Sequence, residues 1–181
     1  MAKAKRKSNG SSKHRAKRST RDAISLLKAD HREVEGWFEQ FEKTRSQERK
    51  VELADKICTA LKVHTRIEEE IFYPAFLEAT DATSVHHEAE VEHEGAKKLI
   101  ATIEAAGPDD YYDARIHVLS EMIKHHVKEE EKTDGMFAKA RASDLDLKAV
   151  GEQLQARKKQ LMGERSSGTS FLESLSTAAT R

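Results

Sequence analysis

The sequence predicts an all-α protein, an up-and-down antiparallel four-helix bundle with an additional C-terminal helix. The 181 residues include two prolines and eight glycines, so few positions break a helix. Apolar residues recur every three to four positions over long stretches, and 35% of the residues are charged, as expected for amphipathic helices. We expect the four bundle helices over residues 21–43, 48–78, 84–106 and 108–141.

The predicted joints between these helices are short. Gly107 followed by Pro108 suits a stop and a restart, since glycine accepts the left-handed position after a helix and proline fits the first turn of the next. Residues 80–84 form a second break with several residues that can cap a helix. Pro74 lies inside the second helix and should bend or end it there.

The segments outside the bundle differ in composition. We assign residues 22–141 to the bundle, 144–162 to an accessory helix and 163–181 to a polar tail. Residues 1–21 hold nine of the 32 basic residues and no acidic one, which leaves an acidic body. We expect this basic tail to be disordered, with a role in solubility or in non-specific contact with nucleic acid.

Two histidine–glutamate pairs stand on the apolar faces of predicted helices. Glu68 follows His64 by four residues, and Glu130 follows His126 by the same spacing, so each pair shares one helix face with core residues. A buried carboxylate costs several kcal/mol unless a cation meets it. His31 and His93 also lie among apolar positions of their helices. Four inward histidines with two carboxylates predict a metal site.

The ligand chemistry of this site follows from the composition. The single Cys58 cannot form an internal disulfide or a thiolate site by itself, so nitrogen and oxygen must hold any metal. Imidazole suits iron, and carboxylates can bridge two divalent ions. Manganese and zinc also fit this ligand set.

Residues 22–140 resemble the hemerythrin-like (HHE cation-binding) proteins. The likeness rests on LLKADHREVE, HTRIEEEIFYPAF, EVEHE and HHVKEEE, in this order along the chain. The resemblance implies a four-helix bundle with two irons and a solvent-derived bridging oxygen. Carried over by position, His31 and His64 would hold one iron and His93 and His126 the other. Glu68 and Glu130 would bridge the two.

The sequence departs from the oxygen-carrying members of that family. Ala89 stands where they have a further histidine, and Glu130 replaces an aspartate that lies one residue later. The pattern matches a branch with four histidines and two glutamates. One metal then needs a ligand from water, Glu90 or His86, and an open water position favours chemistry at the metal over reversible oxygen carriage.

Several neighbouring residues leave alternatives open. A register error of one would exchange His126 for His125 and select Glu129. Glu35 is expected to face solvent or to bond a ligand histidine rather than to bind metal. His86 and His87 are expected at the surface. Three tyrosines are expected first to serve in packing, namely Tyr73, Tyr111 and Tyr112; one that hydrogen-bonds near the metals is the alternative, which the sequence does not place.

The function expected from these observations is that of a non-haem di-iron protein. It would bind or reduce O2, peroxide or NO in oxygen or oxidative-stress sensing or protection, with weak peroxide or oxygen reduction as the enzymatic form. An iron-handling module without turnover and a nucleic-acid-associated protein acting through the basic tail are the alternatives. No segment has the length of a membrane span or the pattern of a secretory signal, so we expect a cytoplasmic protein.

Overall fold

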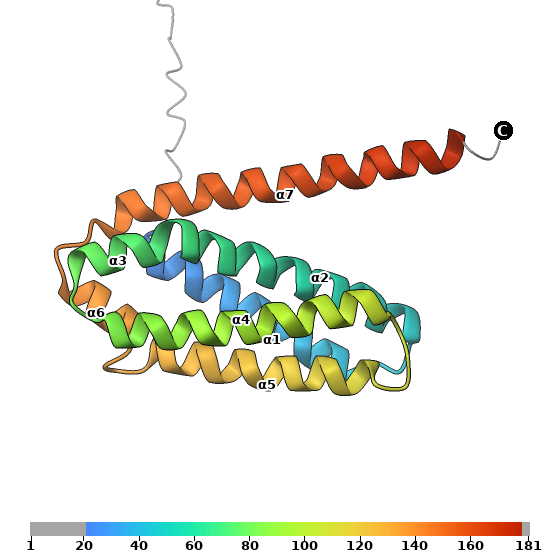
Figure 1. Cartoon of the computed structure of the whole chain (residues 1–181), viewed down its shortest axis with the longest axis horizontal. Coiled ribbons are helices and arrows are strands. Elements are labelled where there is room, and N and C mark those ends of the chain that lie inside the picture. Colours follow the sequence, from blue (N-terminus) through green and yellow to red (C-terminus); the bar gives the residue numbers. More distant parts are fainter. Residues whose placement is uncertain (1–20, 179–181) are drawn as a thin grey trace, which may run out of the picture.

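The computed structural model describes residues 21–178, and the side chains of residues 21–164. Four long helical segments run along one another as the sequence predicts (Figure 1). They are α1 (Ala23–Lys43), α2 (Gln47–Ile67), α4 (Thr83–Ala106) and α5 (Tyr112–Glu131). α1 contacts α2 and α5, and α4 also contacts both, which closes the up-and-down bundle. The all-α prediction is therefore confirmed.

The helix boundaries follow local capping. Asp22 caps α1, its carboxylate accepting a hydrogen bond from the backbone N–H of Ser25 at 2.7 Å. Ser46 caps α2 in the same way through the backbone N–H of Arg49. α4 ends where expected, because Gly107 has a φ of 62°, in the region that favours glycine.

The second predicted helix is continuous, but it changes geometry before Pro74. α2 passes into a π-helical turn, η1 (Glu68–Phe72), and then into α3 (Tyr73–Ala79). Pro74 cannot donate a backbone hydrogen bond and its ring crowds the preceding turn, so a wide turn there relieves the conflict. The wide turn also buries Phe72 and the next residue, Tyr73, at 0% and 1% exposure.

The predicted extent of the fourth helix is wrong, because residues 108–141 do not form a single helix. α5 ends at Glu131, and α6 (Met136–Ala142) begins after a short turn. A Cβ on Gly135 would lie 2.3 Å from the backbone oxygen of Glu129, so only glycine lets the chain pass so close to the end of α5. The turn brings Phe137 against His31, with ring centroids 5.8 Å apart.

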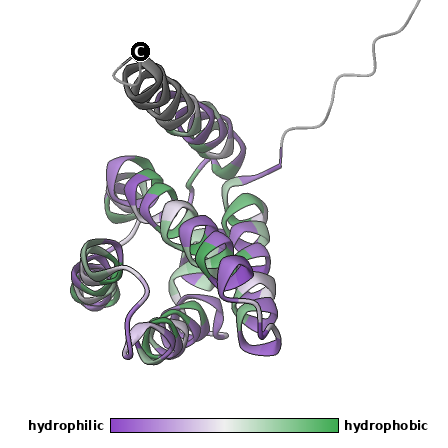
Figure 2. Cartoon of the chain, turned by 90° about the vertical axis from the view of Figure 1, so that its right-hand side faces the viewer, coloured by the Kyte–Doolittle hydropathy of each residue, from purple (hydrophilic) through white to green (hydrophobic). Residues whose placement is uncertain are grey.

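The C-terminal helix α7 (Leu147–Ala178) is longer than the predicted segment 144–162 and continues into the predicted polar tail. It lies beside the four bundle helices in both views (Figures 1 and 2). It contacts α1, α2 and η1, and the predicted stripe residues Val150 and Leu154 are buried there. The predicted basic tail lies outside the described residues, apart from Arg21.

The core consists of two apolar clusters. One gathers Ile24, Leu27, Phe72, Phe76, Met136 and Phe137 with the inner face of α7. The other contains Val34, Phe38, Ile57, Leu61, Ile100 and Leu119. In sequence, the inward histidines of α1 and α4 lie between a member of one cluster and a member of the other, so the bundle holds a polar layer between them.

Candidate metal centre

The six predicted ligands meet in this polar layer. All are buried, with exposures between 0% for Glu68 and 6% for His64. They come from α1, α2, η1, α4 and α5, so the centre joins all four walls of the bundle: His31, His64, Glu68, His93, His126 and Glu130.

The histidines form two pairs through their Nε2 atoms. His31 and His64 are 3.1 Å apart between these atoms, and His93 and His126 are 3.3 Å apart. Nitrogen atoms of this spacing can share one metal ion, because two ligands at about 2.1 Å from an ion lie about 3 Å from each other. The pairing is the one that the sequence resemblance implies.

Each glutamate reaches one histidine of each pair. Glu68 Oε2 lies 3.2 Å from His64 Nε2 and 3.4 Å from His93 Nε2. Glu130 Oε2 lies 3.5 Å from His31 Nε2 and 3.6 Å from His126 Nε2. Both carboxylates therefore stand between the pairs, where they could bridge two ions.

The carboxylates leave polar atoms without partners. Both oxygens of Glu68 and Oε2 of Glu130 are buried and accept no hydrogen bond. Such atoms are costly in a protein interior, and a bound cation would satisfy them. The residues thus fit a metal centre held by imidazole nitrogen and carboxylate oxygen.

A second ring of four carboxylates faces the outer nitrogens of the histidines. Glu131 Oε1 is 2.9 Å from His31 Nδ1, and Glu92 Oε2 is 2.7 Å from His126 Nδ1. Glu69 Oε1 is 3.0 Å from the same atom of His93. Such partners fix the tautomer and orientation of metal-binding imidazoles.

The fourth member of this ring is Asp30, whose Oδ2 lies 3.6 Å from His64 Nδ1. Its other oxygen accepts a hydrogen bond from Nζ of Lys158 in α7 at 2.6 Å. Burial raises the pKa of Asp30, but His64 and Lys158 outweigh it and hold the pKa below its ordinary value. The C-terminal helix is thereby joined to the centre.

Two of the four histidines, His64 and His93, have raised pKa values in the absence of a metal ion, whereas burial lowers the pKa of His31. Burial lowers the pKa of His64, but the carboxylates of Glu68 and Asp30 outweigh it and raise the pKa to about 10. Burial is likewise outweighed at His93, where Glu68 and Glu69 raise the pKa to about 9.

The two glutamates differ in their electrostatics. Burial and the neighbouring Glu68 carboxylate raise the pKa of Glu130 to about 7. Burial also raises the pKa of Glu68, but the nearby imidazoles of His64 and His93 outweigh it and hold the pKa well below its ordinary value. One inner carboxylate is thus strongly ionised, whereas the other resists ionisation until a cation arrives.

Tyr73 lies at the centre, although the sequence favoured a packing role and did not indicate which tyrosine would stand near the metals. Its hydroxyl is 3.2 Å from Nε2 of His93 and donates to Oε1 of Glu130 at 3.4 Å. Burial raises the pKa of Tyr73 well above its ordinary value, so the hydroxyl keeps its proton. The wide turn of η1 carries this residue inward. The regular 3.6-residue period of an α-helix does not predict this inward position.

The alternatives to the six residues lie elsewhere. His125 is 65% exposed in its side chain, and Glu129 pairs with Lys132, so the one-residue shift does not occur. Glu35 pairs with Arg32. The expectation that His86 lies at the surface is wrong, because the residue is 9% exposed and its ring packs edge-on against Tyr73.

The family model described as Hemerythrin HHE cation binding domain matches residues 22–139. The chain belongs to this family of cation-binding proteins. A solved structure of a hemerythrin HHE cation binding domain-containing protein from Mycobacterium kansasii has the same fold, with a TM-score of 0.65. At 24% identity, the likeness covers 80% of this chain and 89% of that one. No curated protein matches the chain.

This hemerythrin domain has no candidate membrane span in its described part. Among residues 21–178, none of the helices combines the length and the apolar character that a span needs.

Proposed function

We propose that this hemerythrin-family chain is a non-haem di-iron protein that binds or reduces a small oxidant, namely O2, peroxide or NO, in sensing or protection. The observation that carries the proposal is the placement of each buried glutamate between the two histidine pairs. His31 and His64 would hold one iron, His93 and His126 the other, and Glu68 and Glu130 would bridge them. Bound iron would supply a redox-active Lewis acid with an open position for the oxidant.

The surroundings favour a small ligand. A small cavity of about 20 Å³ adjoins the four histidines and is otherwise lined mainly by apolar side chains, including Val34, Leu61, Ile123 and Val127. A space of this size holds about one water molecule. These side chains would exclude larger substrates and keep bulk water from the centre.

Tyr73 supplies a proton-bearing group on the other side of the histidines. Its hydroxyl contacts His93 and Glu130, which belong to different walls of the bundle. In the proposed function it donates a hydrogen bond toward the centre and can deliver a proton when an oxidant is reduced.

The test loads the full chain with Fe(II) without air and then mixes it with O2, hydrogen peroxide or NO. We expect a change in the near-ultraviolet and visible absorption together with oxidant consumption faster than that of free iron. His126→Ala should abolish both, whereas His125→Ala, the same change on the exposed neighbour, should retain both. Equal behaviour of the two variants would contradict the proposal. Retention of two irons without any oxidant consumption would favour an iron-handling module instead.

A further inference from the structure

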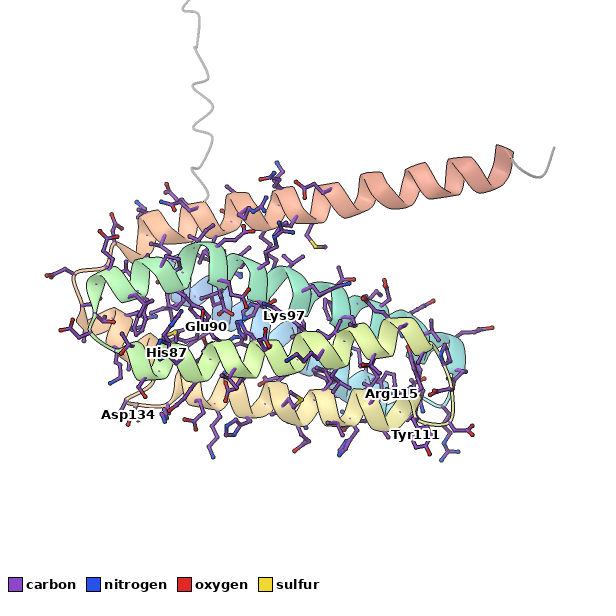
Figure 3. All side chains as sticks on the ribbon, in the orientation of Figure 1. His87, Glu90, Lys97, Tyr111, Arg115 and Asp134 are labelled. Carbon is purple, nitrogen blue, oxygen red and sulfur yellow. The ribbon has the colours of Figure 1, made fainter. Side chains whose placement is uncertain are left out.

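A second group of metal-binding side chains lies near the beginning of α4, outside the six-residue centre. It consists of His86, His87 and Glu90, each of which offers one ligand atom within 4.8 Å of the others. Figure 3 labels His87 and Glu90 on this stretch of the helix. We call these three residues the α4 triad.

The buried member of the triad lacks a hydrogen-bond partner. His86 is 9% exposed, and its Nδ1 is buried without a partner in the described structure. The nearest charged oxygen is Oε2 of Glu90, at 3.6 Å, beyond hydrogen-bonding distance. Leaving such a nitrogen unsatisfied costs about 1–3 kcal/mol. The atom is therefore placed to bind a further group between itself and Glu90.

The other two members can close around such a group. His87 is exposed, and the Glu90 side chain is 52% exposed, so both can change rotamer. The ring of His87 already lies 5.7 Å from that of His86. Ligand atoms about 2.0–2.2 Å from a divalent ion lie about 3–4 Å apart. A shift of about 1 Å by these exposed side chains would satisfy that geometry.

We propose that the α4 triad is a separate site for a divalent first-row transition cation such as Zn²⁺. Two imidazole nitrogens and one carboxylate oxygen suit such an ion better than Ca²⁺ or Mg²⁺, which prefer oxygen ligands alone. Water completes its coordination, because His87 and the Glu90 side chain are exposed to solvent. The site adjoins the main centre through Tyr73, whose ring contacts both His86 and His93.

The test counts metals on the full chain without a histidine tag. The protein is first loaded with iron and then equilibrated with Zn²⁺, and both elements are measured per chain after dialysis at increasing free zinc. We expect about one zinc per chain at saturation, without loss of iron. His87→Ala and Glu90→Gln should each weaken zinc binding at least about tenfold. Glu88→Gln, the same kind of change at an exposed neighbour, should have no effect.

Two results would overturn the proposal. One is a zinc content that is equal in all four proteins at every free-zinc concentration. The other is a gain of zinc matched by an equal loss of iron, which would place the zinc in the main centre. Failure of iron loading would instead count against the proposed function. Zinc would then be measured on the chain without iron, and the triad would account for the zinc that the unmodified protein binds and the His87→Ala variant does not.

Discussion

Replacement of Glu130 by leucine in the protein without metal should reveal how much free energy it costs to bury this carboxylate in its ionised form. The Glu130 side chain is 3% exposed, and its Oε2 accepts no hydrogen bond. Burial and the charge of Glu68 raise its pKa from 4.5 to about 7. Leucine has a similar volume and cannot ionise, so the substitution removes this cost while it also removes a proposed metal ligand.

The pKa shift sets the sign and the size of the effect. Because the pKa is higher in the folded state, that state binds more protons than the unfolded state between pH 4.5 and about 7. The contribution of Glu130 to the free energy of unfolding therefore falls as pH rises through this window. At about 1.4 kcal/mol per pKa unit, the loss amounts to about 3 kcal/mol.

The assay is urea unfolding of chelated protein at pH 5 and pH 8. We expect the free energy of unfolding of Glu130→Leu, minus that of the unmodified protein, to be about 3 kcal/mol larger at pH 8 than at pH 5, which means that the variant is relatively more stable at pH 8. Glu121→Leu makes the same change at an exposed position of α5 and should show no such dependence. A difference between Glu130→Leu and the unmodified protein that is the same at both pH values would refute the reasoning.

Three further predictions concern metal binding and packing. Metal loading at pH 7 should release about two to three protons. His64 and His93 have pKa values of about 10 and about 9 without metal and must be neutral to coordinate, and Glu130, with a pKa of about 7, must be ionised. Calorimetry in buffers of different ionisation enthalpy measures this release. Lys158→Met should weaken metal binding about tenfold through the loss of its bond to Asp30, which chelator competition measures. Gly135→Ala should destabilise the fold by about 1–3 kcal/mol in thermal or urea unfolding, because its Cβ would meet the backbone at the end of α5.

Each of these predictions has its own control. An enthalpy of metal binding that is independent of the buffer would contradict the proton release. Lys159→Met changes an exposed lysine of α7 and should leave metal affinity unchanged. Equal affinities for the two lysine variants would contradict the prediction that the bond between Lys158 of α7 and Asp30 supports metal binding. Gly36→Ala places a methyl group in open space on a helix and should stabilise the fold slightly, in contrast to Gly135→Ala.

The sequence was sufficient to predict the bundle and the meeting of its inward histidines. A histidine or glutamate on an apolar helix face is visible from the 3.6-residue period, and the six residues indeed share one buried layer. Gly107 marked the end of α4 because only glycine takes its conformation readily. These features depend on local geometry, which a sequence encodes directly.

The second ring of carboxylates was not predicted, because it depends on contacts between helices. Asp30, Glu69, Glu92 and Glu131 each adjoin a proposed ligand in sequence, yet each faces a histidine from a different helix. Acidic residues beside a ligand were therefore a usable signal. Tyr73 gave none, because its inward position depends on the π-helical turn before it.

The division of the fourth predicted helix was also beyond the sequence pattern. Phe137 continues the apolar period of α5, so the period predicts an unbroken helix. The structure instead turns at Lys132–Gly135, and Phe137 stacks on His31 from α6. Tertiary packing of one aromatic ring against the centre outweighs the helical preference of a short segment.

Elemental analysis of the full chain, purified without chelators or affinity metals, tests the proposed centre most directly. The account predicts about two irons per chain, and a loss of both in the His126→Ala variant but not in His125→Ala. A folded helical protein that carries no metal, and takes up none when Fe(II) is added without air, would contradict it.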